Sequence, residues 1–222
     1  CSSDLFADSD AEIERRSGRP IAAIFESDGE PSFRATEAGV NIIDVVAYPF
    51  ITDVDKVLAE FPVTDWGKYK NRFKVGGVKI TLDGSPQGRT AFFTTPYLAG
   101  GPGGEKNWKG EPTFPLDLAN KMVKKVYDMK VPLTVHVNGD AAIDQLIGTV
   151  RAAQTAYPGT DRRTVLVHGQ FMREDQVAAI KELGIFPALF PMHTFYWGDW
   201  HRDSVFGSER AANLAPTGWA LD

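Results

Sequence analysis

Strand-like and helix-like segments alternate regularly along most of this chain, and that alternation is what most limits the folds open to it. Short runs rich in Val, Ile, Leu and Thr are followed by polar residues and glycine, as expected of buried strands that end in loops. The predicted strands are 78–85, 133–140, 164–170 and 185–190, and the predicted helices are 116–129, 141–156 and 174–183. Strand, helix and strand at this spacing are typical of βαβ units on a parallel sheet.

One basic side chain lies in each of the first three of these strands. Strand side chains alternate between the two faces of a sheet. Lys79 and His136 therefore project opposite their apolar neighbours, and the same count places His168 on the face of Leu166. His136 and His168 are 32 residues apart, one βα unit, so we expect them at the same level of adjacent strands. The pattern predicts a site at the top of a parallel β/α barrel.

The chain before residue 78 has a weaker pattern. Residues 1–39 are polar at the start and are predicted to be an irregular N-terminal segment. The elements expected before residue 78 are a short strand at 21–25, a strand at 41–47 and a helix that begins at Thr52 or Asp53 and ends near Phe61.

Two aromatic segments flank the predicted strands. The Gly- and Pro-rich loop 84–115 carries several rings, which either face a substrate or pin the loop to the barrel. These rings are Phe92, Phe93, Tyr97 and Trp108. The later cluster of Phe195, Tyr196, Trp197 and Trp200 either walls a pocket or packs on the barrel rim. His201 has no motif around it, and we expect a solvated loop histidine.

Composition excludes several classes of protein. Hydrophobic residues make up 43% and charged residues 24%, and the net charge of −5 gives no reason to expect nucleic acid as a partner. No apolar run approaches the roughly 18 residues that a bilayer-spanning helix needs. Cys1 is the single cysteine, which excludes an internal disulfide and a Cys-based zinc site.

Cys1 also bears on the compartment. The start Cys-Ser-Ser-Asp resembles the mature end of a bacterial lipoprotein, in which Cys1 carries a lipid anchor and the chain belongs to the cell envelope. The alternative is that the sequence simply begins there, and the compartment is then open, with the cytoplasm as the other candidate.

Two histidines at strand ends are a metal-binding pattern. Neutral imidazole is a common zinc ligand, and His136 and His168 would form half of a tetrahedral site. The alternative is that each only hydrogen-bonds within the core. Lys79 also needs an explanation, because burying an isolated ammonium group is very costly. It could pair with Asp83, form a Schiff base with a carbonyl substrate, or become a carbamate that bridges two metals.

The residues around these positions resemble a known family. Residues 78–85 read Val-Lys-Ile-Thr-Leu-Asp-Gly-Ser, residues 135–142 read Val-His-Val-Asn-Gly-Asp-Ala-Ala, and residues 167–170 read Val-His-Gly-Gln. With Phe190-Pro191-Met192-His193 and Gly207-Ser208-Glu209-Arg210, these motifs are similar to the amidohydrolase superfamily. Within it they resemble the YtcJ-like, amidohydrolase-3 branch, which includes N-substituted formamide deformylases. The resemblance implies that residues 40–222 form the central part of an α/β domain, a partial (β/α)8 TIM barrel of the metal-dependent hydrolase type.

The resemblance also implies roles for individual residues. Lys79 would be the carboxylated, metal-bridging lysine, and His136 and His168 would be metal-ligating histidines. The residues at the substrate pocket would be Asp83, Arg89 and His193. The cofactor expected is a divalent metal, Zn before others, and the substrate a small molecule. A metal-bound hydroxide would attack its amide-like, non-peptide carbon–nitrogen bond.

The chain departs from that family in ways that bear on activity. No His-X-His motif is present to supply two further ligands, and the sequence ends at Asp222, before the strand that would carry an aspartate ligand. We therefore expect a fragment or truncated form whose exposed sheet edges favour self-association or a homo-oligomer. Two alternatives stay open, namely a lyase in which Lys79 forms a Schiff base and a non-catalytic barrel remnant.

Overall fold

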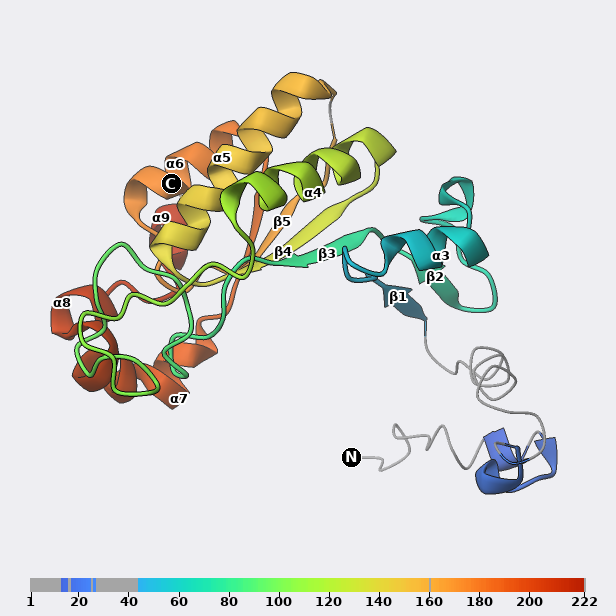
Figure 1. The fold of residues 1–222 in the computed structure, drawn as a ribbon, viewed down its shortest axis with the longest axis horizontal. Helices are drawn as coiled ribbons and strands as arrows, with labels where there is room; N and C mark the ends of the chain where they lie inside the picture. The colour runs from blue at the N-terminus through green and yellow to red at the C-terminus, as the bar shows by residue number, and fades with distance from the viewer. Residues whose placement is uncertain (1–12, 16, 25, 27–43, 160, 222) are drawn as a thin grey trace. The chain divides into compact units, whose positions relative to one another are not determined.

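A computed structural model describes residues 13–15, 17–24, 26, 44–159 and 161–221 of the chain (Figure 1). The chain divides into two compact units. Unit 1 comprises Cys1–Tyr48 and Phe61–Gly76, and unit 2 comprises Pro49–Glu60 and Gly77–Asp222. Cys1 and residues 27–43 lie outside the described residues. The lipid anchor at Cys1 and the boundary at residue 39 therefore stay predictions.

Unit 1 contains a short parallel strand pair. β1 (Val45–Ala47) pairs with β2 (Phe73–Val75), and the 3-10 helix η1 (Val63–Asp65) precedes β2. β1 confirms the described part of the strand expected at 41–47.

The strand expected at 21–25 is wrong for the described residues 21–24, which are helical. Ile21 and Ile24 are three residues apart, so a helix places them on one face, and both pack in a cluster with Ile13.

Unit 2 is built on a four-stranded parallel sheet. Its strands lie in the order β3 (Val78–Thr81), β4 (Leu133–Val137), β5 (Val165–His168) and β6 (Phe186–Leu189). The connecting helices are α4 (Leu116–Met129), α5 (Asp140–Ala156) and α6 (Glu174–Glu182), which lie along one face of the sheet in Figure 1. The short helix α3 (Val54–Glu60) also belongs to unit 2 and confirms the helix expected there. The α/β class and the strand–helix alternation are thus confirmed.

The core of unit 2 lies between this sheet and its helices. The apolar residues of β3 and β4 that alternate with the polar ones are fully buried, and so is an apolar stripe on α4. These residues are Val78, Ile80, Leu133, Val135, Val137, Ala119, Val123 and Val126. Each fully buried Val, Ile or Leu side chain contributes about 1.5–3 kcal/mol of transfer free energy, so this one-sided pattern fixes which face of each strand meets the helices.

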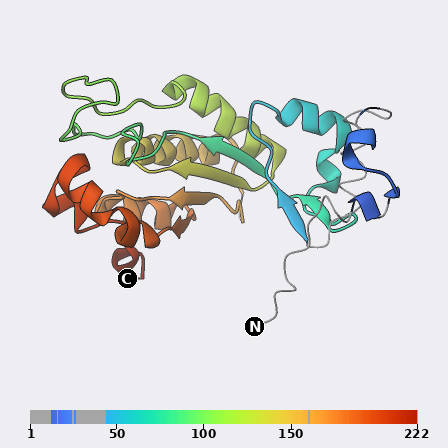
Figure 2. The same cartoon turned by 90° about the horizontal axis from the view of Figure 1, so that it is seen from below.

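The carboxyl ends of the strands are covered by a loop and a set of short helices. The segment between β3 and α4 has no helix or strand, and it lies at the same end of the sheet as the C-terminal helices (Figure 2). These C-terminal elements are α7 (Met192–Trp200), the π-helix η2 (His201–Phe206) and α8 (Ser208–Ala211), whereas α9 (Thr217–Leu221) lies against α6 and the start of β6. The amide nitrogen of Leu98 donates to the carbonyl oxygen of Val205 over 2.9 Å, which ties the loop to η2.

An aromatic cluster forms where the loop meets η2. Its buried members are Ala91, Phe93, Tyr97, Phe171, Val205 and Leu214, with Trp108, Phe206 and Ala211 packed against them. Phe93 and Tyr97 are 1% and 3% exposed, so these two rings pin the loop to unit 2 and do not face a substrate. None of the described helices is long and apolar enough to cross a membrane.

Candidate functional site

Lys79 and His136 lie on the same face of adjacent strands. In the β3–β4 register Lys79 pairs with Thr134 and Thr81 pairs with His136, so the lysine lies two residues before the level of the histidine. All of these side chains are half-buried, on the face away from the apolar core. Burial lowers the pKa of Lys79, because desolvation disfavours the ammonium form. No ion pair with a carboxylate is found for Lys79 among the described residues.

The ring of His136 is held by the loop that follows β3. Its Nε2 lies 3.1 Å from the carbonyl oxygen of Gly84, and the Nδ2 of Asn138 donates to the same carbonyl over 2.9 Å. The same Nε2 lies 3.1 Å from the Nδ2 of Asn138, so Nε2 either donates to the carbonyl or accepts from the amide, and in both cases this ring nitrogen is engaged. A metal-ligating histidine almost always has its second ring nitrogen engaged in this manner. Burial lowers the pKa of His136, which also favours the neutral ligand form.

His168 reaches the same place by a turn of the backbone that strand alternation does not predict. In the register, His136 pairs with Val167 and His168 pairs with Val137, so the expectation that the two histidines share one level is wrong. Alternation alone would also place His168 on the buried side, with Leu166. Instead its φ is +80°, and its ring centroid lies 4.7 Å from that of His136. Burial, followed by the nearby His136, lowers the pKa of His168 to about 4.

This backbone conformation gives a testable result. A left-handed conformation costs a non-glycine residue about 1–2 kcal/mol. We therefore expect His168→Gly to be more stable than His168→Ala by about 1 kcal/mol in urea unfolding. The matched pair at Val167, an ordinary strand position, should show the opposite order, with glycine less stable than alanine by about 0.5–1 kcal/mol. Alanine being the more stable at both positions would contradict the strained conformation.

Asp83 lies next to the site but faces the backbone. Its side chain is fully buried, and its oxygens accept N–H groups from Phe92, Asn138 and Gly139 at 2.8–3.0 Å. Burial raises the pKa of Asp83 to about 7, against the opposing effect of these three donors. The carboxyl group ties the loops after β3 and β4 together and forms no ion pair with Lys79. The geometry gives no support for the substrate contact predicted for Asp83.

Arg89 and His193 occupy different positions relative to the histidine pair. The Nη1 of Arg89 donates to the carbonyl oxygens of Ala99 and Gly100, so its side chain holds the loop. His193 is half-buried on α7, shortly after the end of β6. It is close enough to His168 to lower that group's pKa further. The structure therefore gathers Lys79, His136, His168 and His193 at one end of the sheet.

The prediction that His201 is a solvated loop histidine is wrong. It is 0% exposed rather than solvated, and its ring stacks on that of His193 with centroids 5.8 Å apart. Neither of its ring nitrogens has a hydrogen-bond partner among the described residues. Sequence alone offered a single signal for this residue, its place within an aromatic-rich stretch.

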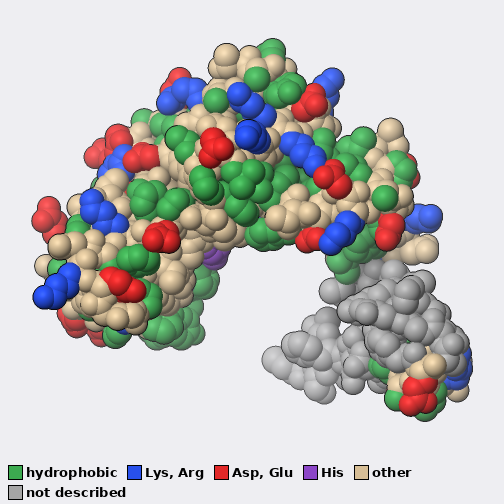
Figure 3. Space-filling model, in the orientation of Figure 1, with side chains coloured by type: hydrophobic (Ala, Val, Ile, Leu, Met, Phe, Trp, Pro, Cys, Tyr) green, Lys and Arg blue, Asp and Glu red, His purple; other side chains and the backbone are tan. Residues whose placement is uncertain are grey.

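The aromatic side chains of α7 do not share one role. Phe195 and Tyr196 are 80% and 67% exposed, whereas Trp200 donates its Nε1–H to the carbonyl oxygen of Gln87 over 3.2 Å and so packs on the rim. In Figure 3 a histidine, drawn in purple, reaches the surface of unit 2 beside hydrophobic side chains.

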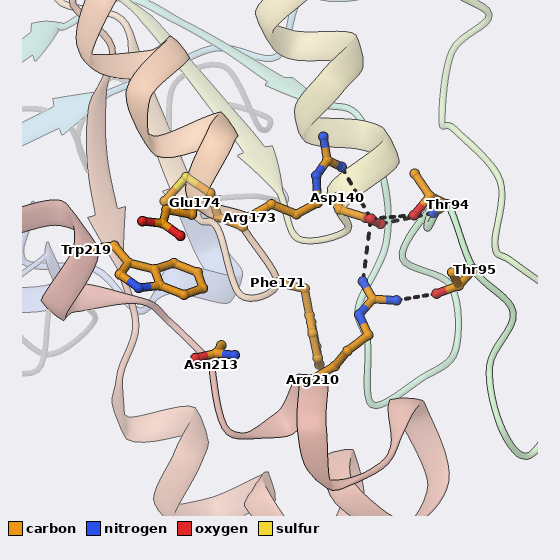
Figure 4. A pocket seen from close by; sticks show the side chains of 10 residues that line it. Thr94, Thr95, Asp140, Phe171, Arg173, Glu174, Arg210, Asn213 and Trp219 are labelled. Atoms are coloured by element: carbon orange, nitrogen blue, oxygen red, sulfur yellow. Dashed lines mark hydrogen bonds and ion pairs between the residues drawn. The ribbon is translucent and has the colours of Figure 1, made fainter.

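A second polar cluster, built around Asp140, lies beside a cavity of about 350 Å³ (Figure 4). Asp140 is the first residue of α5, is 1% exposed and forms ion pairs with Arg173 (3.3 Å) and Arg210 (3.5 Å). It also accepts hydrogen bonds from Thr94, and Arg210 bonds to Thr95. The two arginines share this buried carboxylate, Arg173 also pairs with Asp144 and Asp175, and the cluster joins α5, the loop and α8. Sequence reasoning missed this network, because its members are far apart in the chain.

Solved structures with a similar fold were found. A structure described as an uncharacterized metal-dependent hydrolase from Pyrococcus horikoshii aligns with 86% of this chain and 37% of its own, with a TM-score of 0.67 and 24% identity. A second protein so described, from Pyrococcus furiosus, aligns with 86% of this chain and 45% of its own, with a TM-score of 0.60 and 21% identity. The chain therefore spans less than half the length of these two structures, and the likeness is one of fold.

Comparison at the level of sequence gave a local match and a family match. A stretch of 35 residues, 16% of this chain, is 60% identical to part of shikimate kinase from Mycobacterium avium and covers 20% of that protein. The shikimate kinase from Mycolicibacterium paratuberculosis gives the same match. A stretch of this length does not show a family. The amidohydrolase family, in contrast, matches residues 21–222, which is most of the chain and includes every residue of the histidine site. The chain belongs to the amidohydrolase family.

Proposed function

We propose that this chain is the part of a metal-dependent hydrolase that carries Lys79, His136 and His168 as metal-binding residues. The observation that carries the proposal is the approach of two half-buried imidazoles, 4.7 Å between ring centroids, at the carboxyl ends of β4 and β5. One of them reaches this position only through a strained backbone. Such strain clusters at functional sites, which supports a role for this histidine beyond packing.

The donor set fits a metal in part. Both imidazoles have lowered pKa values, so both are neutral near pH 7 and need not lose a proton to bind a cation. Lys79 lies on the same face, and its lowered pKa makes the free amine, the form that reacts with carbon dioxide, more accessible. Among the described residues no group of three or more His, Cys, Asp or Glu forms a metal site. A carbamate on Lys79 would add oxygen ligands, and other ligands would come from outside these positions.

The residues at this end of the sheet would have different roles. His136 and His168 would hold a divalent metal, with Zn²⁺ the first candidate because imidazole suits it. When bound, such a metal polarises a carbonyl group and lowers the pKa of water. Gly84 and Asn138 would hold the ring of His136 through its Nε2, and His193 would contact a small-molecule substrate. Family membership supports a carbon–nitrogen bond of the amide type as the bond cleaved, and completion of the sheet to an eight-stranded barrel.

Metal binding by this chain tests the proposal. Calorimetric titration with Zn²⁺ should show stoichiometric binding that weakens at least 10- to 100-fold in His136→Ala and in His168→Ala, since losing even an outer-shell partner has that effect. Lys79→Ala should abolish a carbamate signal in ¹³C NMR of protein kept in ¹³C-bicarbonate. Lys121→Ala, on the exposed side of α4, is the matched control and should change neither result.

The outcomes separate this function from its alternatives. Zn²⁺ binding that survives loss of both histidines would overturn the metal assignment. Covalent trapping of a carbonyl compound on Lys79 by borohydride, without a carbamate signal, would favour the Schiff-base lyase. Absence of both, with unchanged folding of His136→Ala, would favour a non-catalytic barrel.

A further inference from the structure

The four histidines of this chain all lie in unit 2 and form two ring pairs at the same end of the sheet. His136 and His168 are one pair, and His193 and His201 are the other. The pairs are neighbours, because His168 pairs with Leu189 in the sheet and His193 follows four residues later. The proposed metal site uses only the first pair, so the second needs its own explanation.

His201 lies between the buried aromatic cluster and the half-buried His193. On one side its ring meets Phe171 edge to face, with centroids 5.4 Å apart and an angle of 84°. Phe171 in turn packs in the aromatic cluster, 5.2 Å from both Phe93 and Phe206. On the other side His201 lies nearly parallel to His193, at 5.8 Å and 17°. Both separations are in the range of favourable aromatic pairs.

The ring itself, rather than its nitrogens, makes the contacts recorded for His201. Both nitrogens are buried without a partner among the described residues, which costs free energy that a phenyl ring would not pay. The Nδ1 of His193 is buried and unpartnered as well, so no hydrogen bond to the described residues fixes that end of its ring. Ring contacts are therefore what can orient the imidazole of His193. Phe190, three residues earlier in the chain, meets it at 5.1 Å and 64°, and His201 stacks on it from η2. The π-helix that begins at His201 is a local irregularity of the kind frequent at functional sites.

We propose that His201 is a positioning residue. It holds the imidazole of His193 beside the His136–His168 site by stacking, with the aromatic cluster packed against its other side. His193 would be the residue that contacts the substrate, and His201 would act only through it. The catalytic benefit of this positioning rests on the proposed function, whereas the contact between the two rings can be measured without a substrate.

Imidazole NMR tests the proposal directly. With ¹⁵N-histidine labelling the chain gives four ring patterns, which single substitutions assign. We expect cross-relaxation between ring protons of His193 and His201 in the unsubstituted protein. His201→Leu should shift or broaden the His193 ring signals, while those of His136 keep their positions. His201→Phe keeps an aromatic ring at this place, so it should retain the His193 pattern of the unsubstituted protein and melt at an equal or higher temperature.

Each outcome bears on one proposal only. Unchanged His193 signals in folded His201→Leu, or no cross-relaxation between the two rings, would overturn the positioning role. If His201→Leu fails to fold, the cross-relaxation result and the His201→Phe spectrum decide instead. Zn²⁺ titration of the same samples separates the proposals, because a failure of the metal site leaves the ring contact intact and loss of the ring contact leaves Zn²⁺ binding intact.

Discussion

Replacing Asp140 by alanine is expected to lower the free energy of unfolding by about 3–5 kcal/mol. Its carboxylate is 2% exposed and is shared by Arg173 and Arg210. Its loss removes the acidic partner of Arg210, which burial already disfavours as a cation, and frees the loop at Thr94. Urea unfolding followed by circular dichroism measures the change.

Asp144 provides the matched control. It also pairs with Arg173, at 2.9 Å, but its side chain is 47% exposed. Ion pairs at this exposure contribute at most about 1 kcal/mol, and Asp144 also accepts a hydrogen bond from Gln176 over 2.7 Å, so Asp144→Ala should cost about 1–2 kcal/mol. If Asp140→Ala and Asp144→Ala lower the free energy of unfolding equally, the burial of Asp140 does not strengthen its ion pairs.

Asp83→Ala is expected to cost about 3 kcal/mol or more, because three buried N–H groups lose their acceptor together at roughly 1 kcal/mol or more each. Asp83→Asn keeps one acceptor oxygen and has the shape of the protonated carboxyl group, so it should lose roughly half as much or less. Thermal and urea unfolding of both variants measure the difference. An asparagine variant as unstable as the alanine variant would contradict this account of the N–H groups.

The protonation of Asp83 should also make the stability of the folded chain depend on pH. The pKa of Asp83 is about 7 in the folded chain and near 3.8 when unfolded, so the folded state retains this proton longer. The stabilising contribution of the protonated group is complete below about pH 4 and is lost as pH rises through 7. The stability of the unsubstituted protein relative to Asp83→Asn should therefore fall between pH 4 and 7. A constant difference over that window would show that the three N–H groups outweigh burial.

Much of the architecture of unit 2 follows from local pattern. The helix predicted at 116–129 matches α4 in both bounds, because an apolar stripe at helical spacing begins after Pro115 and ends before a left-handed Lys130. The strands around Lys79 and His136 follow from strict alternation, with one side buried against helices. Segments with a strong period that is satisfied by one neighbouring layer are those that sequence predicts well.

Other features depended on contacts that no local pattern encodes. Alternation gave the wrong face for His168, since a single positive φ reversed the direction of its side chain. The environment of His201 was also predicted wrongly, since the ring is buried only where Phe171, distant in sequence, packs on η2. Asp140 was read as the end of a strand, although the structure makes it the acceptor that joins two arginines from different elements.

The α/β alternation, the approach of the two strand-end histidines and the family in which they occur can all be predicted from the sequence, because each depends on patterns among neighbouring residues. The backbone turn at His168, the backbone contacts of Asp83 and the stacking of His193 on His201 became visible only in the tertiary structure. These are outcomes of register, backbone turns and long-range burial, in which the free energy of many distant contacts outweighs the preference of any one segment.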